Sequence, residues 1–386
     1  MQPAYEVATL LNRHWDRAND QLQLNSWQWR TLHAIRRCRT AALGGHIDQC
    51  DHCGYLRISY NSCRNRHCPK CQGQKRERWI DARRAELLPV PYYHVVFTLP
   101  QDINSIALYQ PAVVYGLLFT TAWHTIQSFS GDTKYLGAQT GMISILHTWG
   151  QTLSLHPHLH CIIPGGGITK NGRWKASRSN GKYLYPVKAL SKVFRARYVA
   201  ALRTALPGQS KSFFQSLFKK PWVVYAKRPF GGPEQVIEYL GRYTHKIAIS
   251  NHRITNMDDQ TISFRYKDYR LQGVNKTMTL DAIEFIRRFS MHILPKGFVR
   301  IRHYGMLSNA VKPATLPILR EQLMPGISYE SLAKPEVVAV PLVPVCPCCK
   351  KGMMQHLVDF DYRGPPLDTL QLLLKQQNYD HVEMTV

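Results

Sequence analysis

The 386-residue sequence has no apolar run long enough to cross a membrane, and it is short of acidic residues. Its first residues, Met1-Gln2-Pro3-Ala4-Tyr5, lack the basic start and the apolar core of a signal peptide. We find no internal repeat and no G-x-x-x-x-G-K-[ST] loop, the phosphate-binding motif of many ATPases. These absences argue against a membrane protein, a secreted protein and a P-loop ATPase, so we expect a cytoplasmic protein.

The shortage of acidic residues leaves a large positive charge. Only 25 Asp and Glu accompany 50 Lys and Arg, which gives a formal net charge of +25. Such a charge indicates a polyanionic partner, and nucleic acid is the usual one. Aromatic and basic residues are interleaved in Trp27-Gln28-Trp29-Arg30 and from Phe264 to Arg270. That mixture suits single-stranded DNA, although each run alone is more often a solvated strand face.

The ten cysteines are clustered, as is typical of metal ligands in a reducing compartment. Two C-x-x-C pairs separated by residues 54–67 predict a structural zinc site. Its four ligands would be Cys50, Cys53, Cys68 and Cys71. Four nearby residues either form a second site or have single roles: Cys38, His46, Cys63 and His67. A further pair lies in Cys346-Pro347-Cys348-Cys349, and it is a relic, part of a tail, or half of a site completed elsewhere, for example by His356.

The length predicts two or three domains, the hydrophobic content of 44% is too high for a disordered chain, and the alternation of strands and helices with antiparallel pairs predicts the α+β class. We expect a helical and zinc-binding domain over residues 1–90, a catalytic domain over residues 91–309, and a Pro-rich C-terminal segment over residues 310–386. Strands are expected at residues 92–99, 142–148, 155–163, 222–227, 246–251, 261–266, 277–280 and 298–302, and helices at 4–38, 103–128, 187–206, 234–244 and 281–292. A basic helix near residues 74–84 offers four arginines for DNA phosphates: Arg76, Arg78, Arg83 and Arg84.

The most distinctive stretch is Leu155-His156-Pro157-His158-Leu159-His160-Cys161, which we predict to be a strand. Because side chains alternate between the faces of a strand, the three histidines share one face. Neutral imidazoles are good ligands for divalent metals, and two of them at i and i+2 can bind one ion. The pattern therefore favours a metal site at His158 and His160 over a chance run of histidines.

A short predicted helix carries Tyr239 and Tyr243. Tyrosines at i and i+4 lie on one helix face, and such pairs usually belong to a core. A tyrosine can also attack a phosphodiester and remain covalently attached to it, with a metal to polarise the phosphate. The histidine strand and the tyrosines supply both parts of that chemistry. Arg242 and Lys246 would then offset phosphate charge, unless they are ordinary charges at a helix end.

Together these motifs resemble a known family. His158-Leu159-His160 is the His-hydrophobic-His signature of HUH endonucleases, and Tyr239 and Tyr243 look like the paired tyrosines of rolling-circle transposases of the insertion sequence ninety-one family. The segment from Ser62 to Gln72 resembles the zinc-binding domain of that family, and Arg300 to Gly305 is similar to another of its segments. The similarity spans residues 20–310.

The resemblance implies a ferredoxin-like, or RRM-like, HUH nuclease domain with a mainly antiparallel sheet. It implies a bacterial enzyme that nicks single-stranded DNA at transposon ends and target sites through a 5′-phosphotyrosine, with Mg²⁺ or Mn²⁺ as catalytic cofactor and Zn²⁺ as structural metal. It leaves open a homo-oligomer, and a third catalytic metal ligand for which His156 and Gln235 are equal candidates. Two alternatives are a replication initiator with the same chemistry and a non-catalytic zinc-dependent DNA-binding protein.

Overall fold

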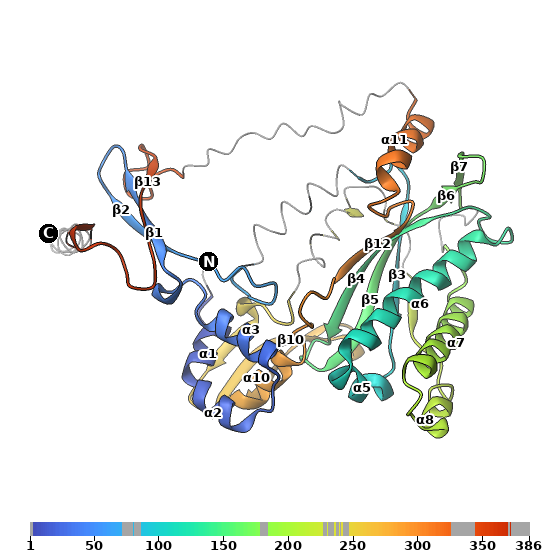
Figure 1. The fold of residues 1–386 in the computed structure, drawn as a ribbon, viewed down its shortest axis with the longest axis horizontal. Coiled ribbons are helices and arrows are strands. Elements are labelled where there is room, and N and C mark those ends of the chain that lie inside the picture. Colours follow the sequence, from blue (N-terminus) through green and yellow to red (C-terminus); the bar gives the residue numbers. More distant parts are fainter. Residues whose placement is uncertain are drawn as a thin grey trace. The chain divides into compact units, whose positions relative to one another are not determined.

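The computed structural model describes residues 3–71, 80, 86–177, 184–226, 230, 235–236, 239, 241, 247–325, 344–369 and 371 (Figure 1). The chain forms two compact units. Unit 1 contains residues 1–72 and 334–386, and unit 2 contains residues 73–333. The region 310–386, expected as a separate segment, is therefore divided between the two units. None of the helices in the described ranges is both long and apolar enough to span a membrane.

Unit 1 begins with three short helices: α1 (Val7–Arg13), α2 (Trp15–Gln21) and α3 (Ser26–Arg36). The sequence predicted one helical region here, and the structure interrupts it at His14 and between α2 and α3. Asn25 starts α3 with a capping box, because its side chain accepts from the Gln28 backbone N–H and the Gln28 side chain accepts from the Asn25 N–H. Leu10 and Leu32 are fully buried between these helices.

The rest of unit 1 is a three-stranded antiparallel sheet that the sequence did not predict. It consists of β1 (Gly45–Cys50), β2 (Leu56–Tyr60) and β13 (Met354–Phe360), in the order β13-β1-β2, and the 3-10 helix η1 (Ala41–Leu43) precedes it. Ile47, Leu56 and Phe360 form its small core. A strand from the end of the chain thus pairs with one near its beginning, from Gly45 opposite Phe360 to Cys50 opposite Met354.

Unit 2 is built on a five-stranded antiparallel sheet with the order β12-β4-β5-β3-β8. Its strands are β3 (Tyr92–Thr98), β4 (Gly141–Trp149), β5 (Leu155–Pro164), β8 (Val224–Ala226) and β12 (Ile301–Gly305). Each lies at or next to a strand predicted from the sequence. The α+β class and the mainly antiparallel sheet are confirmed.

Helices cover one face of this sheet. They are α5 (Asn104–Tyr109), preceded by the 3-10 helix η2 (Gln101–Ile103), then α6 (Pro111–Gly131), α7 (Val187–Ala205) and α8 (Lys211–Ser216) (Figure 1). Phe97 and Leu159 of the sheet pack in one core with Leu118 of α6 and Phe194 of α7, and all four are fully buried. Because Leu159 faces this core, His158 and His160 on the same strand face the opposite side.

A smaller sheet of unit 2 has the order β11-β10-β9, with α10 packed beside it. Its elements are η3 (Asn251–Arg253), β9 (Ile254–Met257), β10 (Thr261–Asp268), η4 (Tyr269–Leu271), β11 (Val274–Asp281) and α10 (Ala282–Ser290). Phe264 is buried against Phe285 of α10, whereas Arg265 and Lys267 are exposed. The aromatic and basic residues of this run therefore follow the alternation of a half-buried strand.

Three elements complete unit 2: β6 (Gly166–Ile168), β7 (Trp174–Ala176) and α11 (Lys312–Leu323). The strand expected at residues 246–251 is wrong, because residues 247–250 are irregular and lead into η3. The Pro-rich region after residue 309 was expected to be a loop, yet it contains α11. Pro313 occupies the first turn of α11, where no intrahelical N–H bond is lost, whereas Pro317 lies inside the helix and removes one backbone donor.

Candidate active site and zinc clusters

Three histidines gather on the sheet face that α6 and α7 leave uncovered. His158 and His160 come from β5, and His147 comes from β4, where it pairs with His158. Candidate ligand nitrogens of the three rings all lie within 4.8 Å of one another. Their ring centroids are 4.6 to 5.5 Å apart, and His147 and His160 are buried. The arrangement brings three imidazoles close enough to bind one ion.

Hydrogen bonds decide which ring nitrogens can bind a metal. His158 Nδ1 lies 2.6 Å from the His156 carbonyl, which can only accept, so this nitrogen carries the proton. His160 Nδ1 lies 3.0 Å from the Tyr239 hydroxyl. The Nε2 lone pair of His158 is then available to an ion, and that of His160 is available when its Nδ1–H donates to the Tyr239 oxygen, as is usual for ligands oriented by an outer partner. Three imidazoles suit Mn²⁺ better than Mg²⁺, which prefers oxygen ligands.

The third histidine of the cluster is not one that the sequence analysis proposed. A β-bulge lies between β4 and β5, because His147 pairs with His158 whereas Trp149 pairs with Leu155. His156 lies beside His158, with ring centroids 5.2 Å apart, but its side chain is exposed and is absent from the cluster. Gln235 is also exposed, one helical turn before Tyr239. The predicted pairing of β4 with β5 was the signal that could have indicated His147.

Tyr239 lies beside the histidines. Its hydroxyl is 2.7 Å from Nε2 of His94, a buried residue of β3 that the sequence analysis missed. His94 Nε2 is in turn 3.0 Å from His160 Nδ1, and the two rings stack with an interplanar angle of 8°. A polar residue in an otherwise apolar strand was the available signal for His94. The structure therefore joins one predicted nucleophile to one predicted metal ligand through a direct hydrogen bond.

Several predicted site residues lie outside the described residues: Tyr243, Arg242, Lys246, Arg76, Arg78, Arg83 and Arg84. The structure makes no statement about them.

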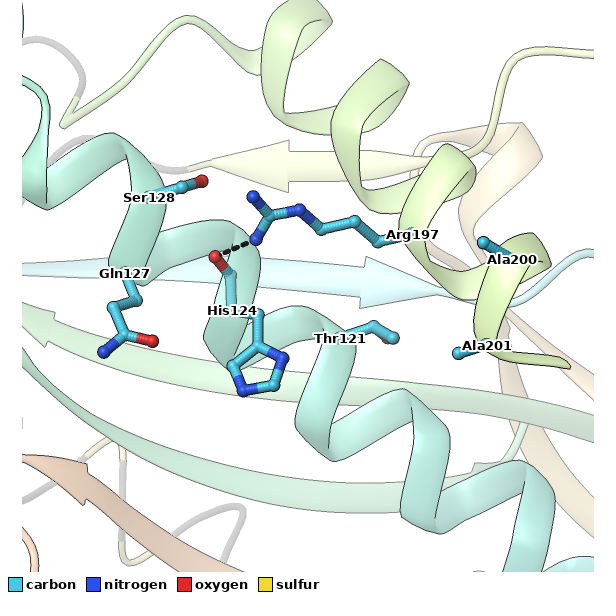
Figure 2. Close-up of a pocket in the computed structure, with 7 residues that line it drawn as sticks. All are labelled: Thr121, His124, Gln127, Ser128, Arg197, Ala200 and Ala201. Carbon is cyan, nitrogen blue, oxygen red and sulfur yellow. Dashed lines mark hydrogen bonds between the residues drawn. The ribbon is translucent and has the colours of Figure 1, made fainter. Parts of the chain in front are cut away.

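A separate hollow of about 560 Å³ lies between α6 and α7 (Figure 2). Thr121, His124, Gln127, Ser128, Arg197, Ala200 and Ala201 line it. Arg197 donates a hydrogen bond to the backbone carbonyl of His124 across it. Both helices cover the sheet face opposite the histidines, so this hollow is distinct from the histidine cluster.

Eight cysteines of unit 1 form two clusters, each with its sulfurs within 4.8 Å of one another. The first contains Cys38, Cys63, Cys68 and Cys71, and the second contains Cys50, Cys53, Cys346 and Cys349. Sulfur–sulfur distances include 3.4 and 3.7 Å in the first cluster and 3.7 Å in the second. A tetrahedral zinc with bonds of ~2.3 Å would place its sulfurs about 3.8 Å apart, so both clusters fit Zn²⁺.

These clusters correct the predicted ligand set, because Cys50 and Cys53 do not share a site with Cys68 and Cys71. The β1–β2 turn holds Cys50 and Cys53, and the pairing of β13 with β1 brings the turn of residues 346–349 beside them. Near the other cluster, the Arg39 backbone N–H donates to the Asn61 carbonyl, which draws the chain before Cys63 towards the end of α3.

The histidines proposed as zinc ligands have other contacts. His46 lies 3.7 Å from a carboxylate oxygen of Asp48, and His67 Nε2 accepts from Arg66 at 3.4 Å. His356, proposed to complete the C-terminal pair, lies 3.3 Å from Asp359. The cysteine turn of residues 346–349 is instead completed by Cys50 and Cys53.

Local hydrogen bonds favour the thiolate form at two of the ligands, Cys38 and Cys349, whereas the side-chain hydrogen bond with Cys38 raises the pKa of Cys63 and Cys68. A side-chain hydrogen bond from Cys63 lowers the pKa of Cys38 to about 7. The backbone N–H of Gly352 donates to Cys349 and lowers the pKa of that thiol to about 6. A Cβ on Gly352 would lie 2.6 Å from the Cys50 sulfur, so only glycine fits beside the second cluster.

Comparison with known proteins identifies the family. Residues 141–314 match the family described as "Putative transposase", and residues 10–99 match the transposase zinc-binding domain of the IS91 type. The chain is 43% identical over 388 residues to a "Putative transposase y4qJ" of Sinorhizobium fredii, covering 94% of this chain and 97% of that protein. The chain belongs to the IS91 family of transposases.

A second relative of this IS91-family transposase is the transposase for insertion sequence element IS801 of Pseudomonas savastanoi pv. phaseolicola. It is 27% identical over 352 residues, covering 84% of this chain and 82% of that protein. No solved structure matches the chain significantly. As a transposase the protein acts on DNA, and its zinc-binding domain and cysteine clusters assign Zn²⁺ as a structural metal.

The segment from Arg300 to Gly305, also similar to the family, has a structural role as β12. Arg302 lies over the Phe119 ring of α6 at 4.3 Å, and Tyr304 stacks on Trp123 at 5.3 Å. Gly305 has a φ of 58°, and a Cβ there would lie within van der Waals overlap of the Thr140 carbonyl. This transposase therefore uses the segment to fasten an edge strand to α6.

Proposed function

We propose that this transposase nicks one DNA strand, becomes linked to its 5′ end through tyrosine, and rejoins that strand elsewhere in rolling-circle fashion. The observation that carries the proposal is the contact of the Tyr239 hydroxyl with His160, a member of the histidine cluster. A nucleophile beside a metal site is the arrangement that phosphoryl transfer requires.

The hydrogen bonds around Tyr239 can be assigned if His160 binds the metal through Nε2. Neutral His160 then carries its proton on Nδ1 and donates it to the Tyr239 oxygen, 3.0 Å away. The Tyr239 hydroxyl in turn donates to His94 Nε2, 2.7 Å away. His94 is therefore the group that receives the tyrosine proton as the oxygen attacks phosphorus.

The reaction follows from these roles. The Tyr239 oxygen forms a bond to the phosphorus of a single-stranded DNA substrate, and the bond from phosphorus to the 3′ oxygen breaks. The departing 3′ oxygen takes a proton from solvent, and the 5′ phosphate stays on the tyrosine. A bound Mn²⁺ or Mg²⁺ would polarise the phosphate oxygens. Because the phosphotyrosine conserves the phosphodiester bond energy, a 3′ hydroxyl can later reverse the step without ATP.

Tyr243 is the second nucleophile in this proposal. It follows Tyr239 by one helical turn in the sequence, and two tyrosines allow two strand transfers at one metal site. The support for Tyr243 comes from the family resemblance alone, since this residue lies outside the described residues.

The test is to map the covalent adduct on single-stranded DNA in the presence of Mn²⁺. Tyr239→Phe and Tyr243→Phe each remove one hydroxyl, so we expect each to bind DNA but to lose complete transposition. The double variant should form no adduct. Tyr304→Phe is the control, because its hydroxyl is buried on the other face of the sheet. An adduct on Tyr304 or Tyr225, or an adduct in the double variant, would show that the two-tyrosine mechanism is wrong.

A further inference from the structure

One edge of the five-stranded sheet exposes apolar side chains on the face of the histidine cluster. Across β5, β3 and β8, His160 pairs with Val96, and Val96 pairs with Tyr225. Directly paired residues of an antiparallel sheet point to the same face, so Tyr225 shares the face of His160. The Tyr225 side chain is 51% exposed, although its neighbour Val224 is buried in the core on the other face.

Val223 extends this exposed edge by one more position. The Thr98 backbone N–H donates to the Val223 carbonyl at 3.1 Å, and Thr98 pairs with His158. Val223 is 62% exposed. Two large apolar side chains, Val223 and Tyr225, are thus turned to solvent beside the proposed site. This pair in register with the candidate active site offers an apolar surface to a ligand bound there.

The distance to the histidines fits a nucleic acid strand. Neighbouring strands are about 4.8 Å apart, which places β8 about 10 Å from β5. Stacked bases rise by about 3.4 Å per nucleotide, so about three nucleotides would reach from the histidine cluster to Tyr225.

The charge of the surrounding chain also favours binding of a nucleic acid strand. No Asp or Glu occurs between Asp132 and Glu234, a stretch that contains β4, β5, α7 and β8. Lys219 and Lys220 are exposed immediately before β8. Arg195 holds this turn by donating to the carbonyls of Phe218 and Lys220 at 3.2 and 3.0 Å. A ring for bases and cations for phosphates are the two requirements of single-strand binding.

We propose that Tyr225 is a base-stacking residue for the strand that enters the active site, with Val223 beneath the same nucleotides. The inference rests on the proposed function, because it takes DNA cleavage to occur at the histidine cluster. It assigns the β8 edge to unpaired DNA rather than to a β-strand of another protein, which would need a longer row of free backbone groups than a three-residue strand offers.

The experiment measures binding of a fluorescent oligothymidylate by the full-length protein in the Tyr239→Phe, Tyr243→Phe background, where no adduct interferes. Tyr225→Thr keeps a β-branched residue in the strand but removes the ring, and we expect its affinity to fall by about 5- to 150-fold. Tyr225→Phe keeps the ring and should bind within about twofold of the parent, in line with stacking rather than hydrogen bonding. Tyr269→Thr is the matched control, since Tyr269 is 70% exposed in η4, between β10 and β11, and should not affect binding.

Unchanged affinity in Tyr225→Thr, or equal losses in Tyr225→Thr and Tyr269→Thr, would overturn the proposal. An equal loss of affinity for duplex DNA would do the same, because paired bases cannot stack on the ring. Binding is measured without cleavage, so a failure of the nuclease mechanism is detected separately, by the absence of an adduct in the protein with Tyr239 intact.

Discussion

Each ring of the histidine cluster is oriented by a different contact. His158 is held by the His156 carbonyl, and His160 by Tyr239 and His94. The His147 ring stacks on Trp149 with centroids 4.8 Å apart and an interplanar angle of 19°. Partners of this kind fix ring orientation before an ion binds, which is how outer residues raise the affinity of metal sites.

Replacing His147 tests which histidine is the third metal ligand. We expect His147→Ala to weaken Mn²⁺ binding by at least about tenfold, because one of three ligands is lost. His156→Ala is the control: it keeps the carbonyl that orients His158, so Mn²⁺ affinity should not change. Mn²⁺ titration followed by electron paramagnetic resonance measures both. The opposite result, a loss of Mn²⁺ affinity in His156→Ala alone, would show that His156 is the third metal ligand, as strand alternation predicts.

The β4–β5 turn is held from outside by the smaller sheet and α10. Leu153 is fully buried with a φ of 59°, a left-handed conformation that costs energy in a leucine. His292 Nε2 donates to the Leu153 carbonyl at 3.0 Å, and its Nδ1 accepts from the Thr148 hydroxyl at 3.1 Å. Arg253 and Arg288 also donate to carbonyls of this turn. The turn that follows His147 is thereby fixed by four hydrogen bonds.

His292 should make stability depend on pH. Burial lowers its pKa from 6.5 to about 4, so between these values the unfolded chain binds a proton that the folded chain does not. Stability is therefore lost as pH falls, by about 2 kcal/mol between pH 7 and pH 5 for this group. In His292→Gln, which retains a donor and an acceptor without titrating, that loss should disappear.

The measurement is the denaturant midpoint of unfolding for both proteins at pH 7 and pH 5. Acid also protonates the zinc-binding cysteines, but equally in both proteins, so the difference between them isolates His292. Equal losses in the two proteins would mean that His292 is not buried in its neutral form.

Local pattern in the sequence was enough to predict the elements of the large sheet and two residues of its site. Strict alternation identified β5, and the spacing of His158 and His160 identified their shared face. His147 was missed because a single bulge residue alters the register between β4 and β5. The local sequence pattern does not predict such a bulge. His94 was missed because its partner Tyr239 is distant in the sequence.

The zinc ligands also could not be grouped from local sequence, because they are brought together by contacts between distant parts of the chain. Sequence spacing groups cysteines that are near in the chain, and it joined Cys50 and Cys53 to Cys68 and Cys71. In the structure, residues 334–386 belong to the same unit as residues 1–72, and strand pairing selects the partners. Unit 1 is thus assembled from the two ends of the chain, and its second zinc cluster secures that long-range pairing.

This assembly predicts two zinc ions per chain and a loss of one when the C-terminal turn is altered. Cys346→Ser removes one of four thiolates from the second cluster, so we expect zinc content to fall from two to one per chain, because three remaining ligands leave the site open. Cys348→Ser is the control, since this exposed thiol lies in the same turn but outside the cluster. Elemental analysis of purified protein counts the zinc.

The same change should loosen β13, because metal binding at a structural site is coupled to folding. Hydrogen exchange of the backbone from Met354 to Phe360, which pairs with β1, should accelerate in Cys346→Ser and remain slow in Cys348→Ser. The first cluster, made only of residues from Cys38 to Cys71, should keep its zinc in both variants. If Cys346→Ser instead retained two zinc ions, Cys346 would not be a zinc ligand. The ligand set predicted from sequence spacing, Cys50 and Cys53 with Cys68 and Cys71, would then be supported.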